Sequence, residues 1–229
     1  YHFYKPYLET RFKENFIIES ERKVIRNCKR GELMQLYRDD HLIAGSLLRK
    51  FGDRLVPVLV GVADNINREI YKGIFAALYY YTILYAYNNG FTEIDFLGSR
   101  PILDDGLFRY KRKWGTEIRP SPIPRGDILI KPLRFNEPML GFFSHNHFIV
   151  REGNRLLSKV LRYKNPLSLQ EIKRIQEYYF TEGLDHIKVF SMMGFDEKSQ
   201  GWAENNFPKI KLVDLRFTSL PHENFCREK

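Results

Sequence analysis

The chain has 229 residues, of which 43% are hydrophobic and 15% aromatic, and its 37 basic and 28 acidic side chains leave a formal charge of +9. This composition excludes a disordered chain and allows one substantial core, or one core with a small appended domain. The positive charge favours partners that carry phosphate, such as a nucleotide cofactor, tRNA or an anionic lipid head group.

Two further features of the sequence bear on the cellular compartment and on whether the chain crosses a membrane. The two cysteines, Cys28 and Cys226, lie far apart without the spacing of a zinc site or a disulfide framework, so we expect a reducing, cytoplasmic compartment. No stretch reaches the roughly 18 apolar residues of a membrane span, because Lys72 interrupts the longest apolar run. We therefore expect a soluble protein, with peripheral membrane contact left open. The chain begins at Tyr1 rather than a methionine, so an upstream segment is also left open.

The first part of the chain predicts helices followed by an antiparallel meander. Apolar residues recur at helical spacing in residues 7–30, which predicts one or two amphipathic helices. Three β-like runs follow at residues 33–37, 42–48 and 55–62, and their polar connections have the length that hairpins use.

A long apolar run then predicts the helix on which the rest of the chain packs. Residues 70–88 are too many for a strand and carry apolar side chains on almost every face, so we expect a helix buried nearly all round. Gly90 marks its end, and residues 91–97 predict a short strand closed by Gly98.

The sequence changes character after this unit. Residues 107–114 predict a short basic helix, and residues 127–133 predict a strand that follows a proline-rich connection. A soft boundary near residues 134–138 divides the chain into a domain of residues 1–134 and a C-terminal α/β extension of residues 135–229.

The extension is predicted to be a second, small α/β unit. A hairpin joins residues 141–150 and 156–163, and Ser168 begins a capping box that opens a helix reaching about residue 180. A helical turn is expected at residues 201–206, and strands at 186–192 and 209–217.

Several short motifs follow one another at a characteristic spacing. They are Ala44-Gly45 in the second hairpin strand, Gly90, Ile94-Asp95-Phe96 with Gly98, and Gly106-Leu107-Phe108 through Lys111 to Trp114-Gly115. In this order, after a meander and a long helix, they resemble the GNAT acyltransferase superfamily. More narrowly, they resemble its Fem-like branch, which includes the aminoacyltransferases of peptidoglycan bridge synthesis and acetyltransferase-like proteins.

The resemblance covers residues 33–133 and implies a fold and an activity. The implied fold is mixed α/β, with a predominantly antiparallel sheet, a central buried helix and the small C-terminal α/β unit. The implied activity is that of an N-acyltransferase, which moves an acyl or aminoacyl group from a CoA or tRNA donor to a small-molecule or peptide amine by direct attack.

The donor stays open because the phosphate-binding pattern is degraded. GNAT enzymes that use acyl-CoA open the long helix with Arg/Gln-x-x-Gly-x-Gly/Ala, whereas this chain has only Arg68, Lys72 and Gly73 near that place. Fem-type enzymes also lack a good copy, since they take the acyl group from aminoacyl-tRNA. Fem-type proteins carry two GNAT-like halves, however, and this sequence shows one.

The start of the long helix is the candidate site for the donor's phosphate. A helix N-terminus offers unpaired N–H groups and a partial positive charge, to which Arg68 and Lys72 would add formal charge. The missing side chain of Gly73 would let a phosphate approach the backbone. In the alternative interpretation, Gly73 serves helix–strand packing and the two cations are solvated.

The polar residues after the Ile94 strand are the candidates for chemistry, because the resemblance places the reacting groups there. Asp95 could accept the amine proton or orient the nucleophile, with Ser99 as a second catalytic candidate and Arg100 as a substrate contact. A carboxylate at this place could equally cap a neighbouring backbone group, and we leave both roles of Asp95 open.

The basic helix offers a substrate-binding surface. Cations such as Lys111 neutralise phosphate, and the rings of Tyr110 and Trp114 suit stacking on a base or sugar. The resemblance gives Lys111 the family's recurrent lysine position. The other interpretation is a solvated face with Trp114 in the core.

Two acidic and two histidine residues complete the candidates. Asp104 and Asp105 are expected in a solvated loop, and His145 and His147 on one face of a strand as an incidental pair, so no metal site is expected. A rival to the enzyme is a catalytically inactive GNAT-fold module that binds tRNA or another polyanion through its basic face. A third possibility is an interaction protein whose C-terminal unit docks a partner.

Overall fold

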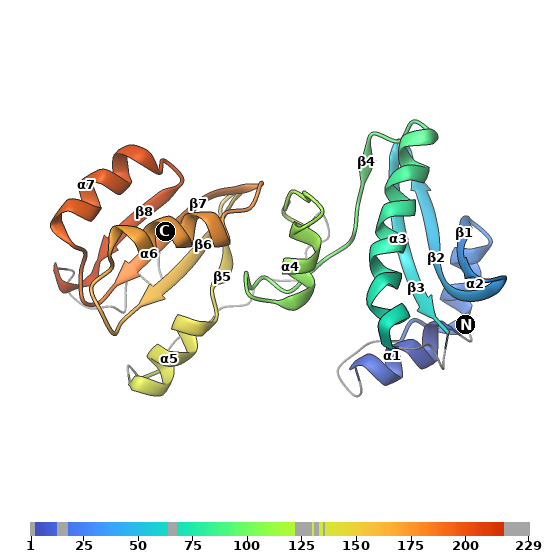
Figure 1. Ribbon diagram of the computed structural model, residues 1–229, viewed down its shortest axis with the longest axis horizontal. Coiled ribbons are helices and arrows are strands. Elements are labelled where there is room, and N and C mark those ends of the chain that lie inside the picture. The colour runs from blue at the N-terminus through green and yellow to red at the C-terminus, as the bar shows by residue number, and fades with distance from the viewer. Residues whose placement is uncertain are drawn as a thin grey trace. The chain divides into compact units, whose positions relative to one another are not determined.

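The fold was obtained as a computed structural model, which describes residues 3–12, 18–63, 68–121, 130, 133–134 and 136–217. The side chains of residues 10–12, 68–72, 197–198 and 204 are outside this description. The chain forms two compact units, Tyr1–Leu97 and Gly98–Lys229, shown in Figure 1. The division into domains at residue 134 stays a prediction.

The first unit is a meander with a long helix. Its sheet has the order β1-β2-β3-β4, in which β1–β2 and β2–β3 are antiparallel and β3–β4 is parallel. Figure 1 shows α3 running along this sheet. The predicted helices, hairpins and long helix are confirmed. In chain order the elements are α1 (Tyr4–Phe12), α2 (Glu21–Cys28), β1 (Gly31–Arg38), β2 (His41–Phe51), β3 (Arg54–Val62), α3 (Arg68–Asn88) and β4 (Glu93–Ile94).

Helix α3 buries one face rather than all of them. Every fourth residue, namely Ile74, Leu78, Thr82 and Ala86, is at most 3% exposed. The expectation of burial nearly all round is wrong, because one sheet covers only one face of a helix and the phenol rings tolerate contact with water. The outward side chains of Tyr80, Tyr81, Leu84 and Tyr87 are exposed.

Strand β4 is much shorter than the predicted strand at residues 91–97. The Asp95 N–H donates to the Leu55 carbonyl (2.9 Å), and the pairing with β3 goes no further. Two residues later, Leu97 has a φ of +65°, which takes the chain out of the extended conformation. Strand β3 therefore continues to Val62 without β4 beside it.

The second unit is a mixed sheet with helices on both faces. Its order is β5-β6-β7-β8; β5–β6 is an antiparallel hairpin, and β6, β7 and β8 are parallel, joined by α6 and α7. Parallel neighbours need such helical crossovers. The elements are α4 (Gly106–Arg112), α5 (Glu137–His145), β5 (Phe148–Glu152), β6 (Arg155–Arg162), α6 (Leu169–Tyr179), β7 (Leu184–Ser191), α7 (Glu197–Asn206), β8 (Ile210–Asp214) and the 3-10 helix η1 (Leu215–Phe217).

Alternate residues of β6 point to two different cores. Val160 packs in one cluster with Ile172 and Ile175 of α6. Its neighbour Leu161 packs in another with Phe143 of α5. Because successive strand residues face opposite sides of a sheet, α6 and α5 cover opposite faces. The mixed α/β fold class with a C-terminal α/β unit is confirmed.

Local predictions in this unit had mixed outcomes. The capping box at Ser168 is present, and the helix it opens, the β5–β6 hairpin and β7 are confirmed. The helical turn expected at residues 201–206 is the end of the longer α7. The expected strand at 209–217 stops at Asp214. The strand expected at 127–133 falls mostly on residues that the structure does not describe.

Residues 141–145 form the end of a helix, so the strand expected there is wrong. Asn136 caps this helix by accepting a hydrogen bond from the Met139 N–H (3.1 Å), and a proline stands in its first turn. A short apolar run does not distinguish a strand from a helix by itself. His145 and His147 therefore do not share a strand face, because His145 ends α5 and His147 precedes β5.

Candidate functional site

The start of α3 leaves room around Gly73. Gly73 is exposed, and a Cβ placed on it would meet no atom of the described residues within 4 Å. The alternative interpretation of this glycine, helix–strand packing, is therefore wrong. The side chains of Arg68 and Lys72 lie outside the described residues, so phosphate binding at this corner stays a prediction.

Asp95 makes the backbone contact that was one of its two expected roles. Its Oδ1 accepts a hydrogen bond from the Leu97 N–H (2.8 Å), and its Oδ2 lies 3.9 Å from Nη1 of Arg54. The carboxylate thus supports the turn in which Leu97 takes its positive φ. Its side chain is 38% exposed, which leaves it accessible to a solvent-borne group.

Lys111 supports the segment that carries Ser99 and Arg100. Its Nζ donates to the Gly98 carbonyl (2.9 Å), and only 8% of the residue is exposed. Ser99 is half-buried and Arg100 exposed. Asp95 belongs to the first compact unit, whereas the other predicted catalytic and substrate-binding residues belong to the second.

Helix α4 is held at both ends by its own residues and by α6. Asp105 caps it by accepting from the Leu107 and Phe108 N–H groups, each at 3.0 Å, so Asp105 has a structural role beyond that of a solvated loop residue. At the other end, the half-buried rings of Tyr110 and Trp114 meet edge to face with centroids 6.4 Å apart.

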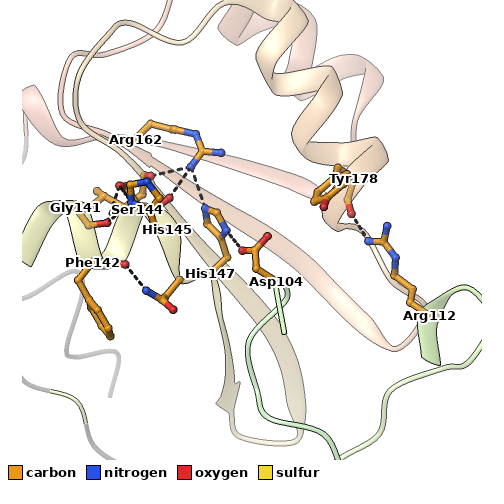
Figure 2. Close-up of polar contacts among 11 residues, drawn as sticks. Asp104, Arg112, Gly141, Phe142, Ser144, His145, His147, Arg162 and Tyr178 are labelled. Carbon is orange, nitrogen blue, oxygen red and sulfur yellow. Dashed lines mark hydrogen bonds and ion pairs between the residues drawn. The ribbon is translucent and has the colours of Figure 1, made fainter. Parts of the chain in front are cut away.

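The basic face of α4 is partly occupied within the unit. The guanidinium groups of Arg109 and Arg112 lie 5.2 and 5.7 Å from the ring of Tyr178 on α6. Arg112 also donates to the Tyr178 carbonyl, as Figure 2 shows. These cation–π contacts dock α4 on α6, so this charge run is not simply a solvated face.

A buried polar cluster lies beside α4, between the first loop of the unit and its sheet. Figure 2 shows the His147 ring between Asp104 and Arg162. Nδ1 of His147 is hydrogen-bonded to Oδ2 of Asp104, and its Nε2 lies 2.9 Å from Nη1 of Arg162. The ring of Tyr179 packs on the imidazole at 4.5 Å between centroids. Only 3% of His147 is exposed.

The electrostatics of the cluster favour a neutral histidine. Burial lowers the pKa of His147 and outweighs the opposing effect of Asp104, and the positive charge of Arg162 lowers it further. Burial, with the charge of Asp104, raises the pKa of Tyr179. Because both ring nitrogens of His147 are engaged, the cluster serves to hold the Asp104 loop on the sheet and not as an available base.

Sequence reasoning missed this cluster. Asp104 was expected in a solvated loop, which is wrong because its carboxylate is hydrogen-bonded to the His147 ring. The expectation that His145 and His147 are an incidental pair concerned a metal site and did not address this cluster. The partners Asp104 and His147 are 43 residues apart, and Arg162 follows 15 residues later, so no local spacing links them. Among the described residues, no group of three or more His, Cys, Asp or Glu side chains is placed to hold a metal ion. No helix in the described ranges is long and apolar enough to cross a bilayer.

Where β4 has ended, the side of β3 that faces away from β2 presents a backbone N–H donor. The Leu55 carbonyl bonds Asp95, and the Val62 N–H donates to the Phe3 carbonyl (3.3 Å), so both groups point away from β2. Backbone direction alternates along a strand, which turns the Val60 N–H to the same side as that of Val62. No described strand pairs with Val60 on that side. A donor of this kind can stabilise a developing oxyanion.

Comparisons with known proteins bear on the first unit and on the start of the second. Neither the curated proteins nor the solved structures include a significant match to this chain. Residues 11–112, which extend from α1 to the end of α4, match the family described as the acetyltransferase (GNAT) domain, so this part of the chain is similar to that domain.

Proposed function

We propose that the protein is an N-acyltransferase that moves an acyl or aminoacyl group from a CoA or tRNA donor to an amine acceptor by direct attack. The observation that carries this proposal is the GNAT domain match over residues 11–112. The meander, the parallel β3–β4 pair and the intervening α3 agree with it. The acceptor is a small-molecule or peptide amine.

The reaction needs a neutral amine, a site for the oxyanion and a proton route. The amine nitrogen attacks the donor carbonyl, a C–N bond forms, and the C–S or C–O bond to the donor breaks. The amine proton finally reaches the leaving thiolate or alkoxide. We assign the Val60 N–H to the carbonyl oxygen, because its direction is set and no described strand competes for it.

The spacing along β3 separates Val60 from Asp95. The Asp95 N–H bonds the Leu55 carbonyl, and Val60 is five residues further along the strand, which is about 17 Å at 3.3–3.4 Å per residue. One tetrahedral carbon cannot contact both groups. We therefore place the acyl carbon near Val60 and give Asp95 the positioning of the turn at Leu97. Ser99 stays a catalytic candidate on the resemblance alone.

The donor's phosphate is assigned to the start of α3. The open surroundings of Gly73 support this assignment, with Arg68 and Lys72 supplying charge. GNAT enzymes typically use acyl-CoA, whereas the degraded phosphate pattern and the Fem-like motifs favour aminoacyl-tRNA. On the resemblance alone, Arg100, Tyr110, Lys111 and Trp114 are assigned to the substrate.

A donor comparison tests the activity. The protein is incubated with acetyl-CoA, a long-chain acyl-CoA or an aminoacyl-tRNA mimic, together with a panel of amines, and acylated product is measured by mass spectrometry. We expect transfer from one donor class. Absence of transfer from every donor, combined with polyanion binding that weakens steeply with salt, would instead establish the inactive binding module.

A proline substitution tests the assigned oxyanion donor. Val60→Pro removes this N–H without removing a β2–β3 bond, and β3 already carries Pro57. Turnover should fall about 10²–10³-fold, as for the loss of one oxyanion donor, while the circular dichroism spectrum stays that of the parent. Asp95→Asn is the matched comparison. If Asp95→Asn abolishes turnover and Val60→Pro leaves it unchanged, the acyl carbon lies near Asp95 and not near Val60.

A further inference from the structure

The outermost strand of the first sheet is an open edge. Strand β1 has eight residues, and no other described strand pairs with it on the side away from β2. Leu33 and Tyr37 are 61% and 54% exposed. Neither a proline nor a lysine interrupts the strand. Proteins normally blunt such an edge because its free N–H and C=O groups pair readily with another strand.

A groove continues this surface toward α3. It has a volume of about 420 Å³ and lies between β1 and the outer face of the helix. None of its described lining side chains is charged, and two from α3, Tyr81 and Leu84, are among the exposed ones. The lining residues are Met34, Gln35, Leu36, Tyr37, Leu78, Tyr81, Leu84, Tyr85 and Asn88.

The hairpin turn decides which backbone groups face the open side. Asp39 and Asp40 form a two-residue turn with φ values of 49° and 61°, so the flanking residues Arg38 and His41 are a hydrogen-bonded pair. The register shift between Leu36 and Tyr37 leaves the extra residue, Ile43, on β2, so hydrogen-bonded and non-bonded positions still alternate along β1. The N–H and C=O groups of Leu33, Gln35 and Tyr37 therefore point away from β2.

We propose that β1 pairs with β1 of a second copy of this chain, antiparallel and centred on Gln35. A strand edge is complementary to another strand, and pairing about a two-fold axis lets one surface satisfy itself. In this register, Gln35 lies opposite Gln35 of the second copy, and Leu33 lies opposite Tyr37. The outward groups of both strands meet as hydrogen-bonded pairs.

Charge selects this register from its neighbours. Centring on Gln35 places Glu32 opposite Arg38 of the second copy, once on each side of the axis. A shift of two residues either way loses both Glu32–Arg38 pairs, because Arg38 then aligns with Arg30 before β1, or Glu32 aligns with Asp40 in the hairpin turn. Like charges directly opposite destabilise a strand pair, whereas opposite charges stabilise it. A shift by one residue would place backbone groups that point toward β2 opposite groups that point away from it. Such registers cannot form the hydrogen bonds and are excluded.

The pairing would also cover apolar surface on both faces of the sheet. On the face of α3, Met34 lies opposite Leu36 of the second copy, beside the groove. On the other face, two Leu33–Tyr37 pairs flank the axis. Glu32 keeps its contact with Lys50, whose Nζ lies 2.5 Å from Oε1, and gains Arg38 from the second copy.

Sedimentation velocity of the intact chain tests the proposal first. A reversible monomer–dimer equilibrium is expected in the micromolar range, as for a modest interface. Sedimentation as a monomer at every concentration up to about 100 µM, roughly a hundred times a micromolar Kd, would overturn the proposal.

Charge reversal then tests the register. Glu32→Arg and Arg38→Glu each create two like-charge contacts across the axis, so each should raise the dimer Kd about tenfold or more. The double variant E32R/R38E restores opposite charges and should return the Kd to within about threefold of the parent value, a difference of about 0.65 kcal/mol. A double variant as weak as the singles, or singles that dimerise like the parent, would rule out this pairing.

A backbone substitution provides an independent test. Gln35→Pro removes an N–H that points to the open edge, so the β1–β2 hairpin should stay folded while the dimer is lost. Leu36→Pro removes an N–H that points to β2 and should unfold the hairpin. A folded Gln35→Pro variant, judged by circular dichroism, that still dimerises with the parental Kd would contradict the proposal.

Discussion

Nε2 of His147 lies 2.9 Å from Nη1 of Arg162, and because a guanidinium group can only donate hydrogen bonds, this nitrogen must accept. The ring proton therefore resides on Nδ1, where it faces Asp104. Protonation of Nε2 would point a second N–H at a permanent cation. The cluster is thus compatible with one protonation state of the imidazole.

We expect this cluster to make folding stability depend on pH. The pKa of His147 is below its ordinary value in the folded chain, because of burial and then the charge of Arg162, so the unfolded chain binds more protons in the interval between the two values. The free energy of unfolding should therefore decrease as the pH falls from about 6.5 toward the folded-state pKa. Denaturant unfolding between pH 5 and pH 8, roughly the range in which histidine titrates, measures this slope.

A pair of histidine variants identifies the group that causes the pH dependence of folding stability. His147→Gln should remove the slope and lower the free energy of unfolding by about 1–3 kcal/mol at neutral pH, since two half-buried polar partners lose a hydrogen-bonding neighbour. His145→Gln changes the exposed histidine at the end of α5 and should keep the parental slope. Asp104, Arg162, His145 and Tyr179 are the ionisable groups around His147. An unchanged slope in His147→Gln would assign the dependence elsewhere.

Removing the amine of Lys111 should loosen the segment that carries Ser99. Lys111→Met keeps most of the apolar stem but leaves the Gly98 carbonyl without this donor, which should cost about 1–2 kcal/mol of stability. Thermal unfolding measures the change. Lys113→Met, on the exposed neighbour at the end of α4, is the control and should shift Tm little. If both variants unfold at the parental temperature, the bond to Gly98 contributes nothing.

The cap of α4 should be replaceable by another good capping residue. Asp105→Ala loses the hydrogen bonds to the Leu107 and Phe108 N–H groups and should destabilise the protein by about 1 kcal/mol. Asp105→Ser keeps a capping oxygen and should recover most of this loss. Equal melting temperatures for the alanine and serine variants would show that the carboxylate acts through its charge on the helix dipole instead.

Local patterns were sufficient for most elements of the fold. The capping box at Ser168 predicted the start of α6, and the glycine after α3 predicted the end of that helix. The structure confirms both, because each signal depends on single residues near the helix terminus. The two-residue turn at Asp39 and Asp40 similarly sets the β1–β2 hairpin. These features depend on neighbours in the sequence, which is why one sequence suffices to find them.

Features set by distant partners were not predictable in this way. The exposure of Tyr81 depends on how many layers of structure cover α3. That number cannot be predicted from the hydrophobic residues next to Tyr81 in the sequence. The association of His147 with Asp104 depends on the pairing of the loop after Gly98 with β5, where the Leu103 N–H donates to the His147 carbonyl (2.9 Å). Asp95 is intermediate, since its bond to the Leu97 N–H is local and was one of two roles left open.

A glycine-to-alanine pair separates donor binding from helix stability. Gly73 in α3 and Gly201 in α7 are both helical, and a Cβ at either position would meet no atom of the described residues within 4 Å. Both alanine variants should therefore stabilise the fold by about 0.5–1 kcal/mol through the lower entropy of the unfolded chain. At Gly73 alone, the added methyl group would obstruct a phosphate approaching the backbone. Gly73→Ala should thus raise KM for the donor severalfold while raising Tm, whereas Gly201→Ala should raise Tm only. A Gly73→Ala variant with parental KM would exclude this corner from the donor site, because its stability would show that the fold had tolerated the change.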